Sequence, residues 1–200
     1  KLMKLILDTE TISLDKPFVY DLGYTIADAD GNIIAKKSYV ITQIWNNKEL
    51  FATSYYAAKK PLYISRLKSK YSKKVSWGNA MRYLANDIKK YGVTEIFAYN
   101  SKFDTRALNF MCAWYKVVNG LGAFKINDIM KYIAPITETE DYKNFCESNG
   151  YMTAHKIPQC QKKAETLYRY LTKNVDFTEE HTGLEDSLIE LEILMVALGN

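Results

Sequence analysis

Residues 5–11 read Leu-Ile-Leu-Asp-Thr-Glu-Thr, a run of branched apolar residues that ends in acids. The apolar start predicts a buried strand, and Asp8 and Glu10 would then point to the same face of its sheet. Two partly buried carboxylates repel each other unless a positive charge neutralises them. A hard divalent cation is well suited to that role, because Mg²⁺ and Mn²⁺ prefer carboxylate oxygens. The common alternative is a pair of solvated acids beyond the end of the strand.

The rest of the chain alternates between strand and helix patterns. Residues 18–42 predict two strands joined by a tight turn at Asp30-Gly31-Asn32, because Asp-Gly between apolar runs is typical of a hairpin. Further strands are expected at 94–100 and 123–129, and helices at 50–92, 102–115, 138–150, 159–173 and 184–198. This order predicts an α/β fold with a five-stranded mixed sheet, an antiparallel meander of three strands plus two parallel strands, flanked by helices. No repeat or linker divides the chain, so residues 1–200 are expected to form a single domain.

The composition is that of a globular protein without a membrane partner. The chain has 200 residues, 48% of them hydrophobic, and a net charge of +4, which weakly favours an acidic partner. No apolar run is long enough to cross a bilayer, and no signal peptide is apparent. The three cysteines form no CxxC pair, so a reduced, cytoplasmic protein is expected.

Two other segments carry acids at the ends of predicted elements. Asp104 follows the predicted strand at 94–100, which ends in Asn100; an ordinary helix cap is the alternative explanation for this acid. His181 precedes the last helix and Asp186 lies in its first turn. Taken singly, His181 reads as a surface histidine and Asp186 as an acid that complements the helix dipole.

Together these residues form a specific pattern. Asp8-x-Glu10, then Asn100-x-x-Phe103-Asp104, then His181 five positions before Asp186 occur in this order on matching elements. The combination resembles the DEDDh branch of the DnaQ-like 3′→5′ exonucleases, which have an RNase H-like fold. The sister DEDDy branch has Tyr four positions before the last Asp, where this chain has Thr182.

Two positions depart from the pattern of that family. Many members continue the first motif as Thr-Thr-Gly, whereas this chain has Thr11-Ile12-Ser13, and the residue before Asn100 is often His but is Tyr99 here. Neither change touches an expected metal ligand, although both bear on how the terminal nucleotide is held. Other segments, such as 54–67, look most like stand-alone members from phages and prophages, which implies a bacterial or phage-infected host cell.

The resemblance implies a mechanism and a set of site residues. Two divalent cations, Mg²⁺ or Mn²⁺, would be held by four carboxylates, and His181 would act as the general base. The metal ligands implied are Asp8, Glu10, Asp104 and Asp186, and the substrate-binding residues are Thr9, Thr11, Ile12 and Asn100. For Ile12, packing in the core is an equal alternative, and for Asn100 ordering of the loop is slightly favoured. His181 lies in a loop next to Gly183, which suggests that it swings in when substrate arrives.

The expected activity is metal-dependent 3′→5′ hydrolysis of single-stranded nucleic acid, with DNA favoured, to nucleoside 5′-monophosphates. RNA trimming like that of RNase T or oligoribonuclease is an alternative within the enzymes. A non-catalytic nucleic-acid-binding module that accompanies a polymerase is the alternative outside them. A monomer is slightly favoured over a dimer.

Residues 59–74 contain seven basic residues and no acid, interleaved with Tyr63 and Tyr71. Such a stretch suits a surface that follows the backbone of a single strand and stacks on its bases, and a solvated helical face is an equal alternative. Cys146, His155 and Cys160 match no common zinc motif, so zinc is not expected.

Overall fold

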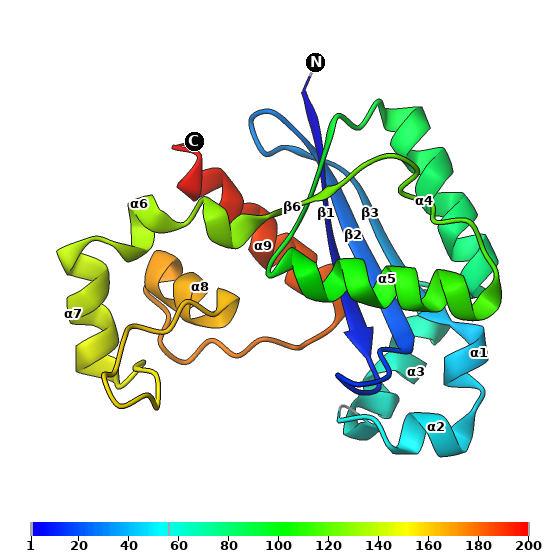
Figure 1. Cartoon of the computed structure of the whole chain (residues 1–200), viewed down its shortest axis with the longest axis horizontal. Helices are drawn as coiled ribbons and strands as arrows, with labels where there is room; N and C mark the ends of the chain where they lie inside the picture. The colour runs from blue at the N-terminus through cyan, green and yellow to red at the C-terminus, as the bar shows by residue number, and fades with distance from the viewer. Residues whose placement is uncertain (1, 56, 200) are drawn as a thin grey trace.

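The computed structural model describes residues 2–55 and 57–199, and it has the predicted α/β architecture (Figure 1). The strands form one mixed sheet in the order β4-β3-β2-β1-β5-β6. Their bounds are β1 Met3–Thr11, β2 Val19–Asp28, β3 Ile33–Ile41, β4 Lys73–Val75, β5 Glu95–Ala98 and β6 Ile126–Asp128. The sheet described here therefore has six strands rather than the predicted five, and the additional one is β4.

The antiparallel meander is confirmed in β1, β2 and β3, which pair successively. The β2–β3 turn lies where Asp30-Gly31-Asn32 predicted it, and Gly31 has a φ of 85°, in the left-handed region that glycine adopts without strain. Strand β5 runs parallel to β1, and β6 runs parallel to β5, as expected for the two later strands. β1 thus lies inside the sheet, and its C-terminal end carries Asp8 and Glu10.

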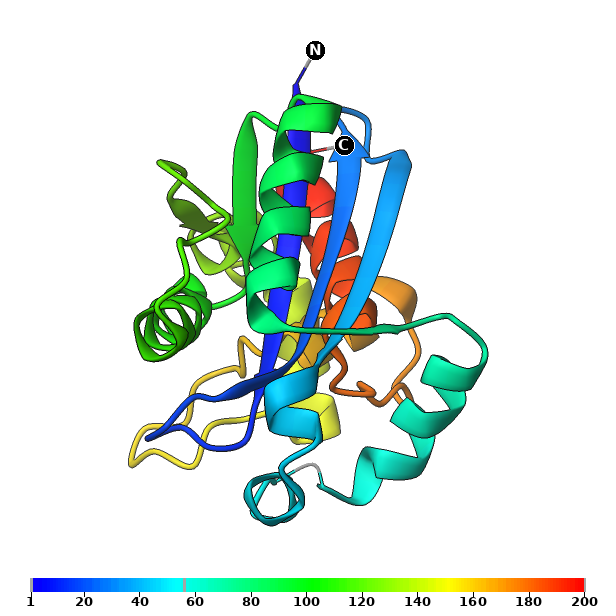
Figure 2. The ribbon, with the colours of Figure 1, turned by 90° about the vertical axis from the view of Figure 1, so that its right-hand side faces the viewer.

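Helices cover both faces of the sheet. The α-helices are α1 Thr42–Trp45, α2 Lys48–Ala52, α3 Lys60–Lys68, α4 Trp77–Tyr91, α5 Ser101–Tyr115, α6 Ala134–Thr137, α7 Glu140–Asn149, α8 Ala164–Thr172 and α9 Gly183–Ala197, with 3₁₀ turns η1 Ala57–Lys59 and η2 Ile129–Lys131. Figure 2 shows α4 in front of the sheet and α9 behind it. Alternate residues of β1 serve the two faces, since Leu5 and Leu7 pack with α4 and α5 whereas Ile6 packs with α9.

The prediction of a helical stretch over residues 50–92 is wrong in the middle of that range. The range is divided into α2, η1 and α3, then interrupted by β4, and only α4 is a long helix. Strand β4 is three residues long and pairs in parallel with the end of β3, with Ile41 opposite Val75. So short and basic a segment becomes a strand only because β3 lies beside it. Gly92 ends α4 in the left-handed conformation, as predicted.

The predicted helix at 159–173 begins later than expected. Residues 159–163 form no helix, and Cys160 instead makes an isolated β-bridge with Met152. The segment thus becomes a loop that folds back beside α7 and leads into α8. Figure 1 shows α6, α7 and α8 to the left of the sheet and α1, α2 and α3 beyond the end of β1. Within the described residues, no helix is both long and apolar enough to cross a membrane.

Candidate active site

Strand β1 presents its two acids side by side. Asp8 and Glu10 follow Ile6 at two-residue intervals, so all three lie on the face that α9 covers. Glu10 is 8% exposed, and Asp8 is half-buried with its Oδ2 atom buried. In the register of β1 with β2, Asp8 lies opposite Gly23 and Glu10 lies opposite Asp21. The prediction of a shared face is therefore correct.

The start of α9 reaches these acids because two glycines allow it. A Cβ built on Gly23 would lie 1.9 Å from the backbone N of Leu184, and one on Gly183 would lie 2.5 Å from the N of Gly23. Only bare backbones can approach so closely. The contact places Asp186, which lies in the first turn of α9 and is 7% exposed, beside the acids of β1. Gly183 is buried in this contact, which contradicts the expectation that it loosens the loop of His181.

Asp104 enters the cluster from α5, which packs on the face of the sheet opposite to α9. It is 1% exposed and lies in the first turn of the helix. Its Oδ1 accepts two hydrogen bonds from Thr9, one from the backbone N at 3.0 Å and one from Oγ1 at 2.8 Å. The hydroxyl of Thr9 is thereby used to orient Asp104. Asn100, in the left-handed conformation with a φ of 58°, occupies the N-cap position, so Asp104 does not cap the helix.

The four predicted carboxylates interact strongly with one another. Burial raises the pKa of Asp8 well above its usual range, and repulsion from Asp186, Asp104 and Glu10 raises it further. Burial likewise raises the pKa of Asp104 to about 7 and, together with nearby acids, that of Asp186 to about 8. Such a cluster favours either protons or cations between its oxygens.

His181 lies at the edge of this cluster. Ligand atoms of Glu10, His181 and Asp186 all lie within 4.8 Å of one another. Burial lowers the pKa of His181 from its ordinary value of 6.5, which favours the neutral imidazole that can accept a proton. The imidazole Nδ1 lies 3.7 Å from Oε2 of Glu179.

The donor set fits a divalent cation. Among the described residues, three buried carboxylate oxygens have no hydrogen-bond partner: Asp8 Oδ2, Asp186 Oδ1 and, on the neighbouring strand β2, Asp21 Oδ1. Buried oxygens of this kind are normally satisfied, and carboxylates are the ligands that Mg²⁺ and Mn²⁺ prefer. The predicted ligands Asp8, Glu10, Asp104 and Asp186 supply carboxylate oxygens that could hold such a cation.

A fifth carboxylate, Glu190, also lies in the cluster and was missed in the sequence. It is 4% exposed, accepts a hydrogen bond from the backbone N of Tyr99 at 3.3 Å, and repels Asp8 more strongly than the other acids do. Its own pKa is raised well above its usual value, first by burial and then by Asp104 and Asp186. The four-residue spacing in the sequence could have indicated this position, because Glu190 lies one helical turn after Asp186 and therefore on the same face of α9.

A cleft of about 820 Å³ is lined by Asp8, Glu10, Asp186 and Glu190 but not by Asp104, and its volume lies within the range of roughly 300–1,000 Å³ typical of ligand pockets. Of the predicted substrate-binding residues, Thr9, Thr11, Ile12 and Asn100 all line it. Ile12 is 4% exposed and also belongs to the hydrophobic core, so both of its expected roles are compatible with its position. Further lining comes from aromatic and apolar side chains and from two lysines: Leu14, Tyr55, Tyr99, Phe103, Met130, Lys162 and Lys163.

Of the two rings in the basic stretch 59–74, only that of Tyr71 is exposed. Tyr63 is fully buried, and its hydroxyl donates to Asp21 Oδ2 at 2.7 Å. The hydroxyl of Tyr71 donates to Glu185, and the guanidinium of Arg66 lies 5.0 Å from the centre of the Tyr71 ring. The expectation of stacking is therefore wrong for Tyr63, which is buried and bound to Asp21 of β2; Tyr71 is exposed, and its hydroxyl is bound to Glu185 at the start of α9.

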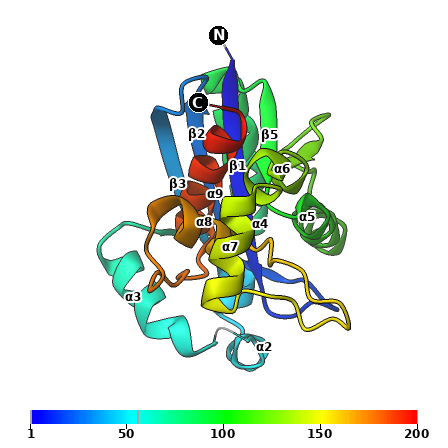
Figure 3. The same ribbon diagram turned by 90° about the vertical axis from the view of Figure 1, so that its left-hand side faces the viewer.

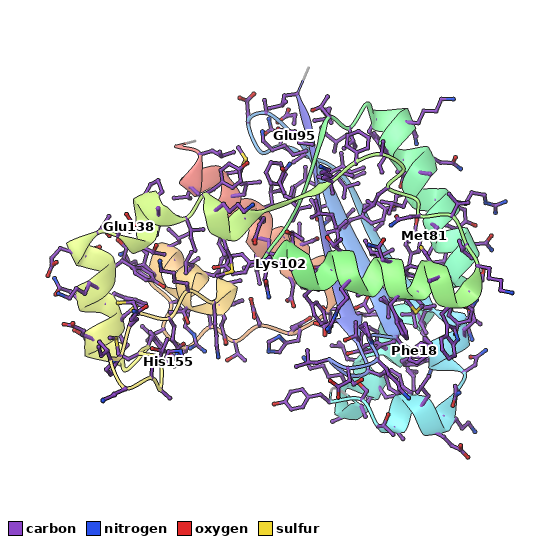
Figure 4. The ribbon with its side chains drawn as sticks, viewed as in Figure 1. Phe18, Met81, Glu95, Lys102, Glu138 and His155 are labelled. Atoms are coloured by element: carbon purple, nitrogen blue, oxygen red, sulfur yellow. The ribbon has the colours of Figure 1, made fainter. Side chains whose placement is uncertain are left out.

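Among the described residues, the group of possible metal ligands contains no cysteine. His155 lies in the loop after α7, away from β1 (Figure 4).

Comparison with known proteins extends this description. Neither a scan against protein-family models nor a search of curated proteins gives a match for this sequence. Solved structures do match. The nuclease domain of 3'hExo, a DEDDh family member bound to rAMP, has a TM-score of 0.64 at 14% identity, over 98% of this chain and 92% of that one.

This chain has the fold of the DEDDh exonucleases. Escherichia coli Exonuclease I in complex with a dA16 oligonucleotide matches with a TM-score of 0.55 at 11% identity, over 96% of this chain and 40% of that one. Exonuclease I from Methylocaldum szegediense matches with a TM-score of 0.52 at 13% identity, over 98% and 40% of the two chains. The chain thus spans nearly the whole 3'hExo domain but about two fifths of the Exonuclease I chains. The RNase H-like fold implied by the sequence motifs is confirmed.

Proposed function

We propose that this protein is a metal-dependent 3′→5′ exonuclease of the DEDDh type that acts on single-stranded nucleic acid, with DNA favoured, and releases nucleoside 5′-monophosphates. The observation that carries the proposal is that Asp8, Glu10, Asp186 and His181 line one cleft, while the buried Asp104 of α5 interacts electrostatically with Asp8 and Glu10. The shared fold with DEDDh nucleases supports it.

The side chains have distinct roles in this proposal. Divalent cations bound by the carboxylates would supply the positive charge that stabilises the phosphate during displacement. His181 would take the proton from the attacking water, and its lowered pKa keeps the imidazole neutral and ready to do so near pH 7. Thr9 holds Asp104 in place, so that the carboxylate from α5 keeps its position relative to β1.

The cleft suits the end of a single strand. Tyr55, Tyr99 and Phe103 offer rings on which bases could stack, and Lys162 and Lys163 offer charges for phosphates. All five side chains line the same cleft as the carboxylates, so stacking, phosphate contact and hydrolysis would occur together.

The direct test uses a single-stranded DNA oligonucleotide labelled at its 5′ end, with Mg²⁺ or Mn²⁺ and then with EDTA. We expect a ladder that shortens from the 3′ end, nucleoside 5′-monophosphates as products, and no digestion in EDTA. Asp186→Asn should abolish digestion, whereas Glu192→Asn on the exposed side of α9 should not. Digestion at the parent rate by Asp186→Asn would refute the assignment of the site.

A further inference from the structure

The loop that carries His181 holds a backbone conformation that needs support. It joins α8 to α9 without regular secondary structure, and His181 has a φ of 51°, in the left-handed region. A residue other than glycine adopts this region at a cost in free energy, so neighbouring contacts must hold it there. Those contacts determine where the imidazole points.

Arg66 of α3 binds the residues on both sides of His181. Its Nη1 donates to Thr182 Oγ1 at 2.9 Å, and its Nη2 forms an ion pair with Glu180. Nη2 also lies 3.7 Å from Oε1 of Glu185. The Arg66 side chain is only 11% exposed and Thr182 is fully buried, so the bond to Thr182 is shielded from solvent, whereas the side chain of Glu180 is 51% exposed.

Helix α3 is itself anchored to the base of the cleft. Tyr63 donates to Oδ2 of the fully buried Asp21, and the same oxygen accepts the backbone N of Gly183 at 2.9 Å. One carboxylate oxygen thus joins α3 to the first residue of α9. Figure 3 shows α3 beside the segment that leads into α9, on the side away from α5. Arg66 therefore reaches the loop from a support that is fixed to β2.

We propose that Arg66 is a positioning residue for His181: its guanidinium holds Glu180 and Thr182 so that the imidazole faces Glu10 and Asp186. This inference rests on the proposed function and adds to it a residue that does not touch substrate. Arg66 then contributes to hydrolysis through loop geometry rather than by binding the nucleic acid. The planar fork of arginine matters here, because one lysine ammonium cannot bond the hydroxyl and the carboxylate in the same directions.

The test compares Arg66→Ala and Arg66→Lys with Arg82→Ala, a matched change of an exposed arginine on α4. Steady-state digestion of a single-stranded oligonucleotide should show kcat lowered roughly 10- to 100-fold in both Arg66 variants, with KM nearly unchanged. Arg82→Ala should behave as the parent. A rise in KM at unchanged kcat would overturn the proposal, because Arg66 would then act by binding substrate.

A second readout does not depend on activity. The chain has two histidines, His155 and His181, so their imidazole C–H resonances can be followed individually by proton NMR. In Arg66→Ala the His181 resonance should shift or broaden, whereas that of the exposed His155 should stay in place. Unchanged His181 resonances would refute the positioning role even if the protein proved not to be a nuclease. If the His181 resonance shifts in Arg66→Ala but the parent protein digests no oligonucleotide, Arg66 supports the loop and only the proposed function is refuted.

Discussion

Asp104 accepts both the backbone N–H and the hydroxyl of Thr9 on a single carboxylate oxygen. The bonds join α5 directly to β1, within the segment that carries Asp8 and Glu10. Partners of this kind orient the ligands of a metal site, and their loss typically weakens metal binding by about 10- to 100-fold.

Thr9→Val should therefore weaken divalent metal binding by about tenfold. The variant keeps the shape of the side chain and the backbone bond but removes the hydroxyl donor. Isothermal titration with Mn²⁺ measures the effect, with Thr53→Val at an exposed position as the control. Equal Mn²⁺ affinity in Thr9→Val and the parent would show that Asp104 needs no support from the hydroxyl.

Glu190→Gln should stabilise the protein when no metal is bound. The change removes a buried charge that repels Asp8, while the amide oxygen can still accept the bond from Tyr99 N. For a protein of this size, each kcal/mol corresponds to a rise in Tm of roughly 2–4 °C. Thermal melts in EDTA at about pH 8 test this, with Glu192→Gln on the exposed side of α9 as the control. A lower Tm for Glu190→Gln would mean that Glu190 is stabilising in the metal-free state.

The stability of the metal-free protein should fall as the pH rises. Asp104 and Asp186 have pKa values of about 7 and about 8 in the folded state, above the ordinary value of 3.8. Protonation therefore favours the folded state; this contribution is complete below about pH 4 and is lost as the pH rises through about 7 to 8.

Urea unfolding in EDTA at about pH 5 and about pH 8 measures this loss, and added Mn²⁺ should restore stability at the higher pH. Asp186→Asn should show a smaller pH dependence, because one of the titrating groups is gone. Greater stability at about pH 8 than at about pH 5 without metal would contradict the assignment of these shifts.

His181→Ala should lose turnover and keep its metal. A general base typically contributes about 10²- to 10⁴-fold to the rate. Because burial lowers the pKa of His181 below 6.5, the parent's kcat/KM should rise with pH through that pKa and then level off. Rate measurements across this range, together with calorimetry, separate the two roles. Loss of Mn²⁺ binding in His181→Ala would make the imidazole a ligand.

Replacing Lys162 and Lys163 with Ala should weaken binding of single-stranded DNA. Both lysines are exposed at the rim of the cleft. Each phosphate contact contributes about 0.7 to the slope of log K against log salt for a single strand, so the double variant should show a shallower slope. Fluorescence anisotropy in an Asp186→Asn background measures binding without digestion, with Lys89→Ala and Lys90→Ala at the end of α4 as the control. Equal salt slopes for the double variant and the parent would show that the single-stranded DNA does not contact these lysines.

The sequence by itself indicated four of the carboxylates that come together in the cluster. Strand periodicity placed Asp8 and Glu10 on one face, and the structure brings them together with Asp104 and Asp186. The meander and the closing helix could also be predicted, because alternation, turn residues and helical spacing are local properties. These features depend on neighbours within a few positions of the chain.

Only the tertiary structure decided what the other residues do. Arg66 and Tyr63 read as part of a basic surface, but their partners Thr182 and Asp21 are 116 and 42 positions away in the chain. Strand β4 likewise exists because β3 offers it an edge, and Glu190 becomes a buried member of the site because α9 packs on β1. A charged side chain gains its role from the groups that fold around it, and spacing along the chain does not specify those groups.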